Sequence, residues 1–279
     1  MIVVVIKGIH KALTPIFHGG NEKTGSVVLL NRIRFIVDDK PMDIPIISGN
    51  QVRGRLRRLL VRDFLEKTGY EMDLSKKKYQ KLYHTLFAGG VLTEATTSES
   101  GVVDLDFKFK IVKYLLPIRL FGTSYSNQII EGRIKVGHLL PICKELSEYT
   151  GVESDTSIYQ LITHSFQTRR DELRAEREEE QAVQMLVEYE VFAPGTRFYH
   201  EIILETTREG YTIDLSTLYR AIKLWRENPF IGGKSSIGFG KLLINYEFPE
   251  KISDKPYLEF IEKNKDRIVE VLEELAERL

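Results

Sequence analysis

The sequence predicts an α+β protein, because segments with strand patterns and segments with helix patterns alternate along its 279 residues. A β-branched run at residues 2–6 opens the chain and indicates a buried strand that extends to Ala12. A basic segment after Ser48 has the periodicity of an amphipathic helix, and a strand, a helix and a strand follow one another after residue 185. An apolar content of 42% at this length suits one large domain or a domain that carries insertions.

The first helix has a clear start signal in the sequence. Ser48 precedes Gln51 by three residues, which is the spacing of a capping box. Val52, Leu56 and Leu60 then recur at helical intervals, so this helix is expected to bury one apolar face. A loop that contains proline and glycine separates it from the first strand.

The middle of the chain is less regular. Apolar and polar residues alternate at residues 104–112 and 132–136, and both segments predict strands. Residues 168–181 are almost wholly charged, which predicts either a solvated helix face or a mobile insertion.

The last third of the chain has the clearest pattern. Strands are predicted at residues 185–192 and 198–205, a helix at 215–226, a closing strand at 242–248, and an amphipathic helix at the C-terminal end. The whole order fits the split βαβ, or ferredoxin-like, arrangement of an antiparallel sheet with helices, which is also the scaffold of RNA-recognition motifs. Unrelated activities share that scaffold, so the fold alone does not define a function.

The formal net charge of zero hides an uneven distribution of charge. Residues 1–144 contain 23 Lys and Arg against 13 Asp and Glu, whereas the rest of the chain contains 17 against 27. The basic part could hold nucleic acid while the acidic part packs against the basic part of the next copy. Uneven surface composition without such a role explains the same numbers.

Composition also excludes several classes of site. The single cysteine, Cys143, cannot build a disulfide framework or a cysteine-based zinc site within the chain, and we expect neither a cofactor nor a metal. No apolar window reaches the length of about 18 residues that a membrane helix needs, and the opening segment is too short for a signal peptide. We therefore expect a cytoplasmic protein without a membrane partner.

A glycine-rich loop lies between the helix predicted at residues 215–226 and the closing strand, in the sequence IGGKSSIGFGKLLI. Its glycines allow positive φ angles, and its backbone amides, with Lys234, Ser235 and Ser236, could surround a phosphate. The spacing does not match a P-loop, and no helix follows it, so a nucleoside triphosphate is not expected. Taken alone, the loop is a weak signal for phosphate binding, and a plain tight turn is the simpler interpretation.

Three separated segments together resemble the RAMP superfamily of CRISPR-associated proteins, specifically the backbone subunit that polymerises along guide RNA. They are HGG with IPIISGNQVRGRLRRLL, then LFGTSYSNQIIEGRIKVGH, and finally FAPGTRFYHEIIL with AIKLW and IGGKSSIGFGKLLI. The resemblance implies one RAMP domain over residues 1–279, elaborated by insertions near 66–130 and 145–184 that include a thumb. It also implies guide RNA (crRNA), target nucleic acid, further copies of the chain and other effector subunits as partners, in defence against viruses and plasmids.

The resemblance also implies which residues meet the RNA. Arg53 and Arg57 fall on the helix that touches the RNA backbone in this family, and Ile237 stands where many members have a basic residue. The implied RNA-binding residues are His18, Gly19, Gly20, Asn31, Arg32, Arg34, Ser48, Gly49, Asn50, Arg53, Arg57, Arg169, Arg170, Gly232, Gly233, Lys234, Ser235, Ser236 and Gly238. Contacts to phosphate and 2′-OH suit a scaffold that must accept any guide, because base pairing then reads the sequence.

Catalysis is not expected. Type III backbone subunits cleave RNA with an aspartate after the first strand, but this chain has no aspartate between His18 and Phe35, and Asn31 stands nearest to that position. An amide cannot act as a general base or hold a metal as a carboxylate would. Three alternatives stay open: a type III nuclease, a guide-processing ribonuclease that uses His10 or His18, and an interaction module that binds no RNA.

Overall fold

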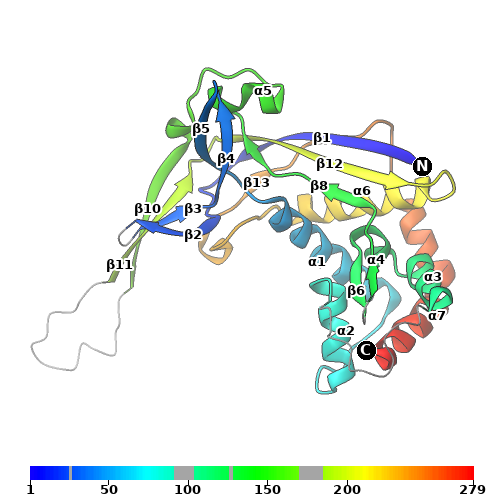
Figure 1. Ribbon diagram of the computed structural model, residues 1–279. Coiled ribbons are helices and arrows are strands. Elements are labelled where there is room, and N and C mark those ends of the chain that lie inside the picture. Colours follow the sequence, from blue (N-terminus) through cyan, green and yellow to red (C-terminus); the bar gives the residue numbers. More distant parts are fainter. Residues whose placement is uncertain (25–26, 91–103, 126–127, 170–184) are drawn as a thin grey trace, which may run out of the picture.

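The computed structural model describes residues 1–24, 27–90, 104–125, 128–169 and 185–279, and its main antiparallel sheet is the centre of the fold (Figure 1). The main-sheet strands are β1 (Ile2–Ala12), β8 (Ile134–Val136), β9 (Leu140–Pro141), β12 (Arg197–Thr206), β13 (Leu242–Leu243) and β14 (Tyr246–Glu247). They lie in the order β13, β1, β12 and β8, with β14 beside β1 and β9 beside β12. Along the chain these are the fourth, first, third and second strands of a βαββαβ unit, so the predicted α+β, ferredoxin-like class is confirmed.

The remaining elements surround this sheet. A second sheet and two hairpins are formed by β2 (Gly19–Thr24), β3 (Val27–Leu30), β4 (Arg32–Val37), β5 (Lys40–Pro45), β6 (Thr123–Tyr125), β7 (Gln128–Ile130), β10 (Ile162–Arg169) and β11 (Met185–Phe192). The helices are α1 (Gly49–Thr68), α2 (Lys77–Phe87), α3 (Leu105–Tyr114), α4 (Leu116–Phe121), α5 (Ser147–Thr150), α6 (Tyr211–Glu227) and α7 (Lys255–Arg278). Figure 1 shows the β10–β11 hairpin projecting away from the group formed by α2, α3 and α7.

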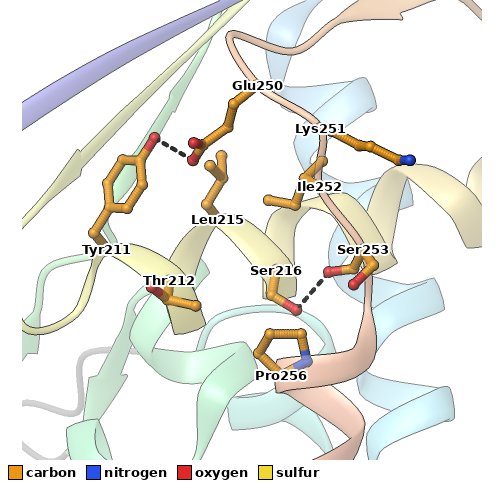
Figure 2. A pocket seen from close by; sticks show the side chains of 9 residues that line it. All are labelled: Tyr211, Thr212, Leu215, Ser216, Glu250, Lys251, Ile252, Ser253 and Pro256. Carbon is orange, nitrogen blue, oxygen red and sulfur yellow. Dashed lines mark hydrogen bonds between the residues drawn. The ribbon is translucent and has the colours of Figure 1, made fainter.

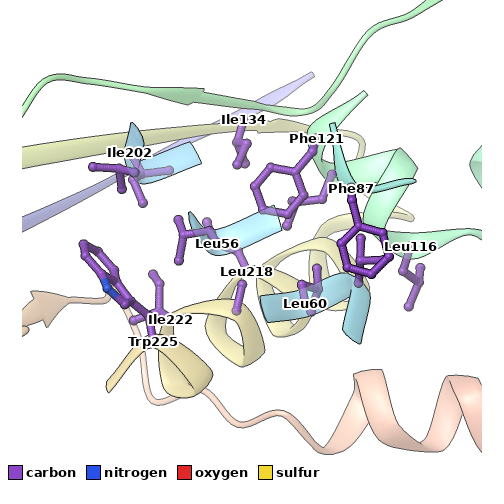
Figure 3. Close-up of a cluster of buried hydrophobic side chains, with 14 of the residues drawn as sticks. Leu56, Leu60, Phe87, Leu116, Phe121, Ile134, Ile202, Leu218, Ile222 and Trp225 are labelled. Carbon is purple, nitrogen blue, oxygen red and sulfur yellow. The ribbon is translucent and has the colours of Figure 1, made fainter. Parts of the chain in front are cut away.

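Helix α1 forms where the sequence predicts it. Ser48 Oγ accepts a hydrogen bond from Gln51 N at 3.3 Å, which satisfies one of the free amides of the first turn. The predicted apolar stripe is buried, and Leu56 and Leu60 belong to the same core cluster as Ile202 of β12 and Trp225 of α6 (Figure 3). Removing such a fully buried leucine side chain typically costs about 2–5 kcal/mol, so this stripe fixes the position of α1.

The prediction of a strand at residues 104–112 is wrong, because this segment belongs to helix α3. Asp104 Oδ1 accepts from Phe107 N at 2.9 Å and caps the helix. Phe107 and Ile111 are buried four residues apart, whereas Phe109, which a strand would bury on the same face, is 68% exposed. The apolar residues therefore alternate in the sequence, although the buried ones follow the period of a helix.

The closing strand predicted at residues 242–248 is interrupted. Its two parts, β13 and β14, pair with different stretches of β1. Between them Asn245 N donates to Nδ1 of His10 at 3.1 Å, so a side chain takes the place of a strand neighbour. The glycine segment after Pro15 also differs from its prediction as a loop, since residues 19–24 form β2.

The other predicted elements agree with the structure. The strands at residues 132–136, 185–192 and 198–205 correspond to β8, β11 and β12, and both late helices are present. Most of the charged run at 168–181 lies outside the described residues. In the described part of the chain, no helix is both long and apolar enough to cross a membrane.

Two buried histidines lie beneath the main sheet. His10 and His200 are both 0% exposed, and Nε2 of His200 donates to Gly137 O at 3.0 Å, so its Nδ1 accepts from the Tyr246 hydroxyl at 2.7 Å. Burial lowers the pKa of His200 to about 4, and burial also lowers the pKa of His10 well below its usual value. From this position His10 cannot meet RNA at the surface, which removes it as a catalytic candidate.

These histidines predict a loss of stability in acid. Their pKa values are lower in the folded protein, so the unfolded chain binds protons first once the pH falls below about 6.5. The contribution of the neutral histidines to stability is fully present above that pH. It is lost as the pH falls toward the folded pKa of His200, about 4. At pH 5 we expect His200 to lower the free energy of unfolding by about 2 kcal/mol, measured by urea unfolding. His200→Gln should flatten this dependence, whereas exposed His84→Gln should not; equal slopes in all three proteins would contradict the prediction.

Candidate nucleic-acid interface

Backbone hydrogen bonds bring the glycine-rich loop and the start of α1 to the same region. Gly233 N donates to Phe17 O at 2.8 Å, and Asn31 N donates to the next carbonyl, that of His18, also at 2.8 Å. Ile46 N donates to Asn31 O at 2.9 Å, two residues before the cap of α1. These five residues, the glycine-loop cluster, therefore join four stretches of the chain, at residues 17–18, 31, 46 and 233.

Close backbone contact explains a glycine beside this cluster. Gly232 has φ 80°, and a Cβ atom there would collide with Phe17 O. Beyond it, Ser235, Ser236 and Gly238 lie exposed around a short 3₁₀ turn. The predicted loop residues are thus accessible to a ligand at the tip and tightly packed at the base.

Lys234 is held against the second sheet. Its Nζ lies 3.7 Å from the centroid of the Tyr189 ring and 5.9 Å from that of Phe17, and it donates to Gln167 Oε1 at 2.7 Å. The backbone of Lys234 has φ 63°, and its side chain contacts Gln167 of β10 and Tyr189 of β11. A phosphate that binds Lys234 must compete with Gln167 and the two rings.

The first turn of α1 packs on the end of β8. Gly49 is buried, its N donates to Nδ1 of His138 at 2.9 Å, and a Cβ atom there would collide with the carbonyls of Val136 and Gly137. Asn50, the next residue, is exposed. Gly49 thus serves the packing of the helix, and Asn50 presents its side chain to solvent.

Arg53 and Arg57 line a polar hollow of about 280 Å³ beside α4 and the β6–β7 hairpin. Nη2 of Arg57 donates to the carbonyls of Phe121 and Gly122 at 2.7 and 2.6 Å, and Nη2 of Arg53 also donates to Phe121 O. Only 4% of Arg57 is exposed. Glu131 lines the same hollow, yet neither arginine makes an ion pair with a described residue.

The electrostatics of this hollow favour an anion. Burial lowers the pKa of Arg57 to about 10, with a further contribution from the charge of Arg53, and burial lowers the pKa of Arg53 as well. Both guanidinium groups are still charged at neutral pH. Arg57 also lies over the Phe121 ring, with its Cζ 5.6 Å from the centroid, but neither arginine has a carboxylate partner among the described residues. Two partly desolvated positive charges in this state are costly, and a phosphate would relieve that cost.

Two further predicted arginines are already paired with carboxylates. Arg32 Nη2 lies 2.5 Å from Glu190 Oε1, and Arg34 binds Asp43 through Nε and Nη2 at 2.9 and 2.8 Å. These pairs neutralise much of the charge that a phosphate would need. Arg169 ends β10, and its side chain lies outside the described residues, as does the whole of Arg170.

Two groups near the interface have unpartnered donors or acceptors. The Nε atom of Arg55 is buried without a hydrogen-bond partner among the described residues, while its Nη2 donates to Asn228 O at 2.9 Å, just before the glycine-rich loop. Nε2 of His18 is also buried without a partner, and burial lowers the pKa of this histidine. Arg55 was not among the predicted contacts, because helical spacing places it on a different face from Arg53; only the basic run itself pointed to it.

Another hollow, of about 210 Å³, lies at the start of α6 (Figure 2). Its polar groups are satisfied within the protein, since the Tyr211 hydroxyl donates to Glu250 Oε1 at 2.8 Å and Ser216 Oγ donates to Ser253 O at 3.0 Å. It contains no buried uncompensated charge. The hollow beside Arg53 and Arg57 is therefore the stronger candidate for an anion.

Comparison with known proteins identifies the class. The family model of the RAMP superfamily matches residues 11–243, so the chain belongs to that superfamily. Among solved structures it is similar to a chain of a structure titled "Type IV-B CRISPR Complex", with 18% sequence identity and a TM-score of 0.64. The match covers 90% of this chain and 96% of that one, which shows a shared fold. No curated protein matched the sequence.

The Lys234 contacts predict a structural contribution of that side chain. Lys234→Ala should lower the free energy of unfolding by about 1 kcal/mol, because it removes a cation–π contact and a hydrogen bond to Gln167. Urea unfolding would measure the change. Lys241→Ala, at an exposed position of the same loop, is the matched control and should change stability by less than about 0.5 kcal/mol. Equal effects of the two substitutions would disprove the role of Lys234.

Proposed function

We propose that this protein is a guide-RNA subunit of a CRISPR effector ribonucleoprotein, which binds the RNA backbone and oligomerises along it. Its partners are the guide RNA, target nucleic acid paired with that guide, other copies of the chain and other effector subunits. Membership of the RAMP superfamily and a fold shared with a chain of a type IV-B complex support this assignment. One domain with insertions near residues 66–130 and 145–184, and a cytoplasmic location, are parts of the same proposal.

The observation that carries the proposal is a pair of arginines on α1 that have no carboxylate partner among the residues that the structure describes. Arg53 and Arg57 line one polar hollow, and their present partners are main-chain carbonyls. The RNA backbone supplies one negative charge per nucleotide, so a phosphate is the anion that this protein would meet most often. The glycine-loop cluster reaches Ile46, two residues before the cap of α1, and offers a second contact to the same strand.

The same chemistry supports binding without sequence preference. Guanidinium groups and backbone amides bind phosphates and 2′-OH groups, which every nucleotide carries. Base edges then stay available for pairing with a target strand, as in other RNA-guided systems.

A role without catalysis is also part of the proposal. Asn31, not a carboxylate, occupies the glycine-loop cluster. Asp38 and Asp39 lie in the turn between β4 and β5 with positive φ angles, and Asp43 is bound by Arg34. None of these carboxylates is placed beside Asn31 by a hydrogen bond, which argues against the metal-dependent cleavage of the type III alternative.

Arg53→Ala should weaken binding to single-stranded RNA about tenfold, because it removes a charged hydrogen-bond donor from the phosphate site. The loss should be equal for unrelated sequences, and the slope of log K against log salt should fall by about 0.7 for each lost phosphate contact. Fluorescence anisotropy over a salt series measures both quantities. Arg53 is preferred to Arg57 here, because Arg57 is buried and its loss would also disturb the core.

The matched control is Arg62→Ala, which removes the same charge from an exposed position on another face of α1. Its effect on RNA affinity should be less than about threefold. Equal losses for Arg53 and Arg62, or a loss confined to one RNA sequence, would overturn the proposed contact.

Labelled RNA should stay intact when incubated with the protein, either with Mg²⁺ or with a chelator. Cutting of a guide-paired target at regular intervals with Mg²⁺ would support the type III alternative instead. Cutting in the chelator would support a processing ribonuclease, and His18→Ala would then test the unpartnered histidine. Denaturing gels over several hours give the readout.

A further inference from the structure

The hollow that Arg53 and Arg57 line, the arginine hollow, is larger than a phosphate needs. It lies where α1, α2, α4 and the β6–β7 hairpin meet (Figure 1), and its volume is about 280 Å³. Pockets for small molecules begin at about 300 Å³, whereas one water molecule takes up about 30 Å³ of the liquid. A phosphate held by the two arginines therefore leaves room in the hollow for the sugar to which it is bound.

Glycines keep two walls of the arginine hollow free of side chains. Gly89 lies just after α2 with φ 94°, and a Cβ atom there would collide with Nη1 of Arg57. Gly122 follows α4 with φ 67°, and a Cβ atom there would collide with the backbone of Gly132. A ligand can therefore approach the main chain closely on these sides.

The polar side chains of the arginine hollow divide into donors and acceptors. The two guanidinium groups supply N–H donors, and the Thr123 hydroxyl is already used, since it donates to Thr85 O at 3.0 Å. Ser124 is half-buried and Glu131 is exposed, and neither side chain has a hydrogen bond or an ion pair with a described residue. Among the described residues, Glu131 is thus a carboxylate without a partner in a hollow that also holds two cations.

The carboxylate makes the arginine hollow a poor site for a simple anion. A phosphate would be attracted by the guanidinium groups and repelled by Glu131. A ligand with a hydroxyl group beside its phosphate changes this balance, because the hydroxyl can donate to the carboxylate. RNA has such a group, the 2′-OH beside the 3′-phosphate, and DNA lacks it.

We propose that the arginine hollow binds one ribonucleotide, with its phosphate on Arg53 and Arg57 and its 2′-OH donating to Glu131. Glu131 is then the residue that makes the site selective for RNA over DNA. This inference rests on the proposed function and adds a determinant of sugar specificity to it. DNA meets the repulsion from Glu131 without the compensating hydrogen bond. Because no base takes part, the selectivity is the same for every sequence.

The ratio of RNA affinity to DNA affinity tests this assignment. Fluorescence anisotropy would compare an RNA with a DNA of the same bases, in which deoxyuridine replaces uridine. The wild type should bind the RNA about tenfold more tightly. Glu131→Ala should bring the ratio below about threefold, because RNA loses a hydrogen bond and DNA is freed from a repulsion. Glu131→Gln should restore most of the preference, because an amide oxygen also accepts a hydrogen bond.

The controls separate the sugar contact from the phosphate contact. Arg53→Ala should weaken RNA and DNA by the same factor, because both carry the phosphate, so the ratio should stay that of the wild type. Glu247→Ala removes an exposed carboxylate from β14 and should also leave the ratio unchanged. RNA with fluorine in place of each 2′-hydroxyl keeps the sugar shape of RNA but has no donor, so the wild type should bind it as weakly as DNA.

An RNA preference that Glu131→Ala leaves intact, or 2′-fluoro RNA that binds as tightly as RNA, would overturn the role of Glu131. A wild type that binds RNA and DNA equally, while Arg53→Ala weakens both, would also overturn it, and the proposed function would then stand. If the wild type binds neither polymer, the proposed function fails together with this inference.

Discussion

The position of α1 is the constraint on which the rest of the structure depends. Its apolar stripe is buried in the core, and its first turn rests on the end of β8 because Gly49 has no side chain. Helical spacing then sends Arg53 and Arg57 toward the carbonyls of α4, and Arg55 toward the end of α6. A shift of this helix by one residue would move every arginine to a different neighbour.

The buried arginines of this protein differ in the partners that they have. Arg220 binds Asp63 and Asp254 and links α1, α6 and α7, while Asp214 is bound by two arginines at the start of α6. These groups are satisfied within the protein. Arg53 and Arg57 differ, because only neutral carbonyls receive their hydrogen bonds. Within the described residues neither of these two arginines has a carboxylate partner, and the anion site that we propose rests on this difference.

Local signals were read correctly from the sequence where one physical effect dominates. The cap at Ser48 and the apolar period after it located α1, and the β-branched run located β1. The segment at 104–112 was misread because Phe109 is apolar but exposed, so its alternation with Phe107 imitated a strand. The closing strand was misread because His10, more than 200 residues away, accepts the amide hydrogen bond at Asn245.

The sequence by itself determined the fold class, the basic helix and the glycine-rich loop, because periodicity, capping and glycine content act over a few residues. Only the tertiary structure decided which cations are available to a ligand. Arg32, Arg34 and Lys234 are basic in sequence, yet Glu190, Asp43 and the ring of Tyr189 occupy them. The free charge of a side chain depends on partners that folding brings from distant segments, and no local pattern encodes those partners.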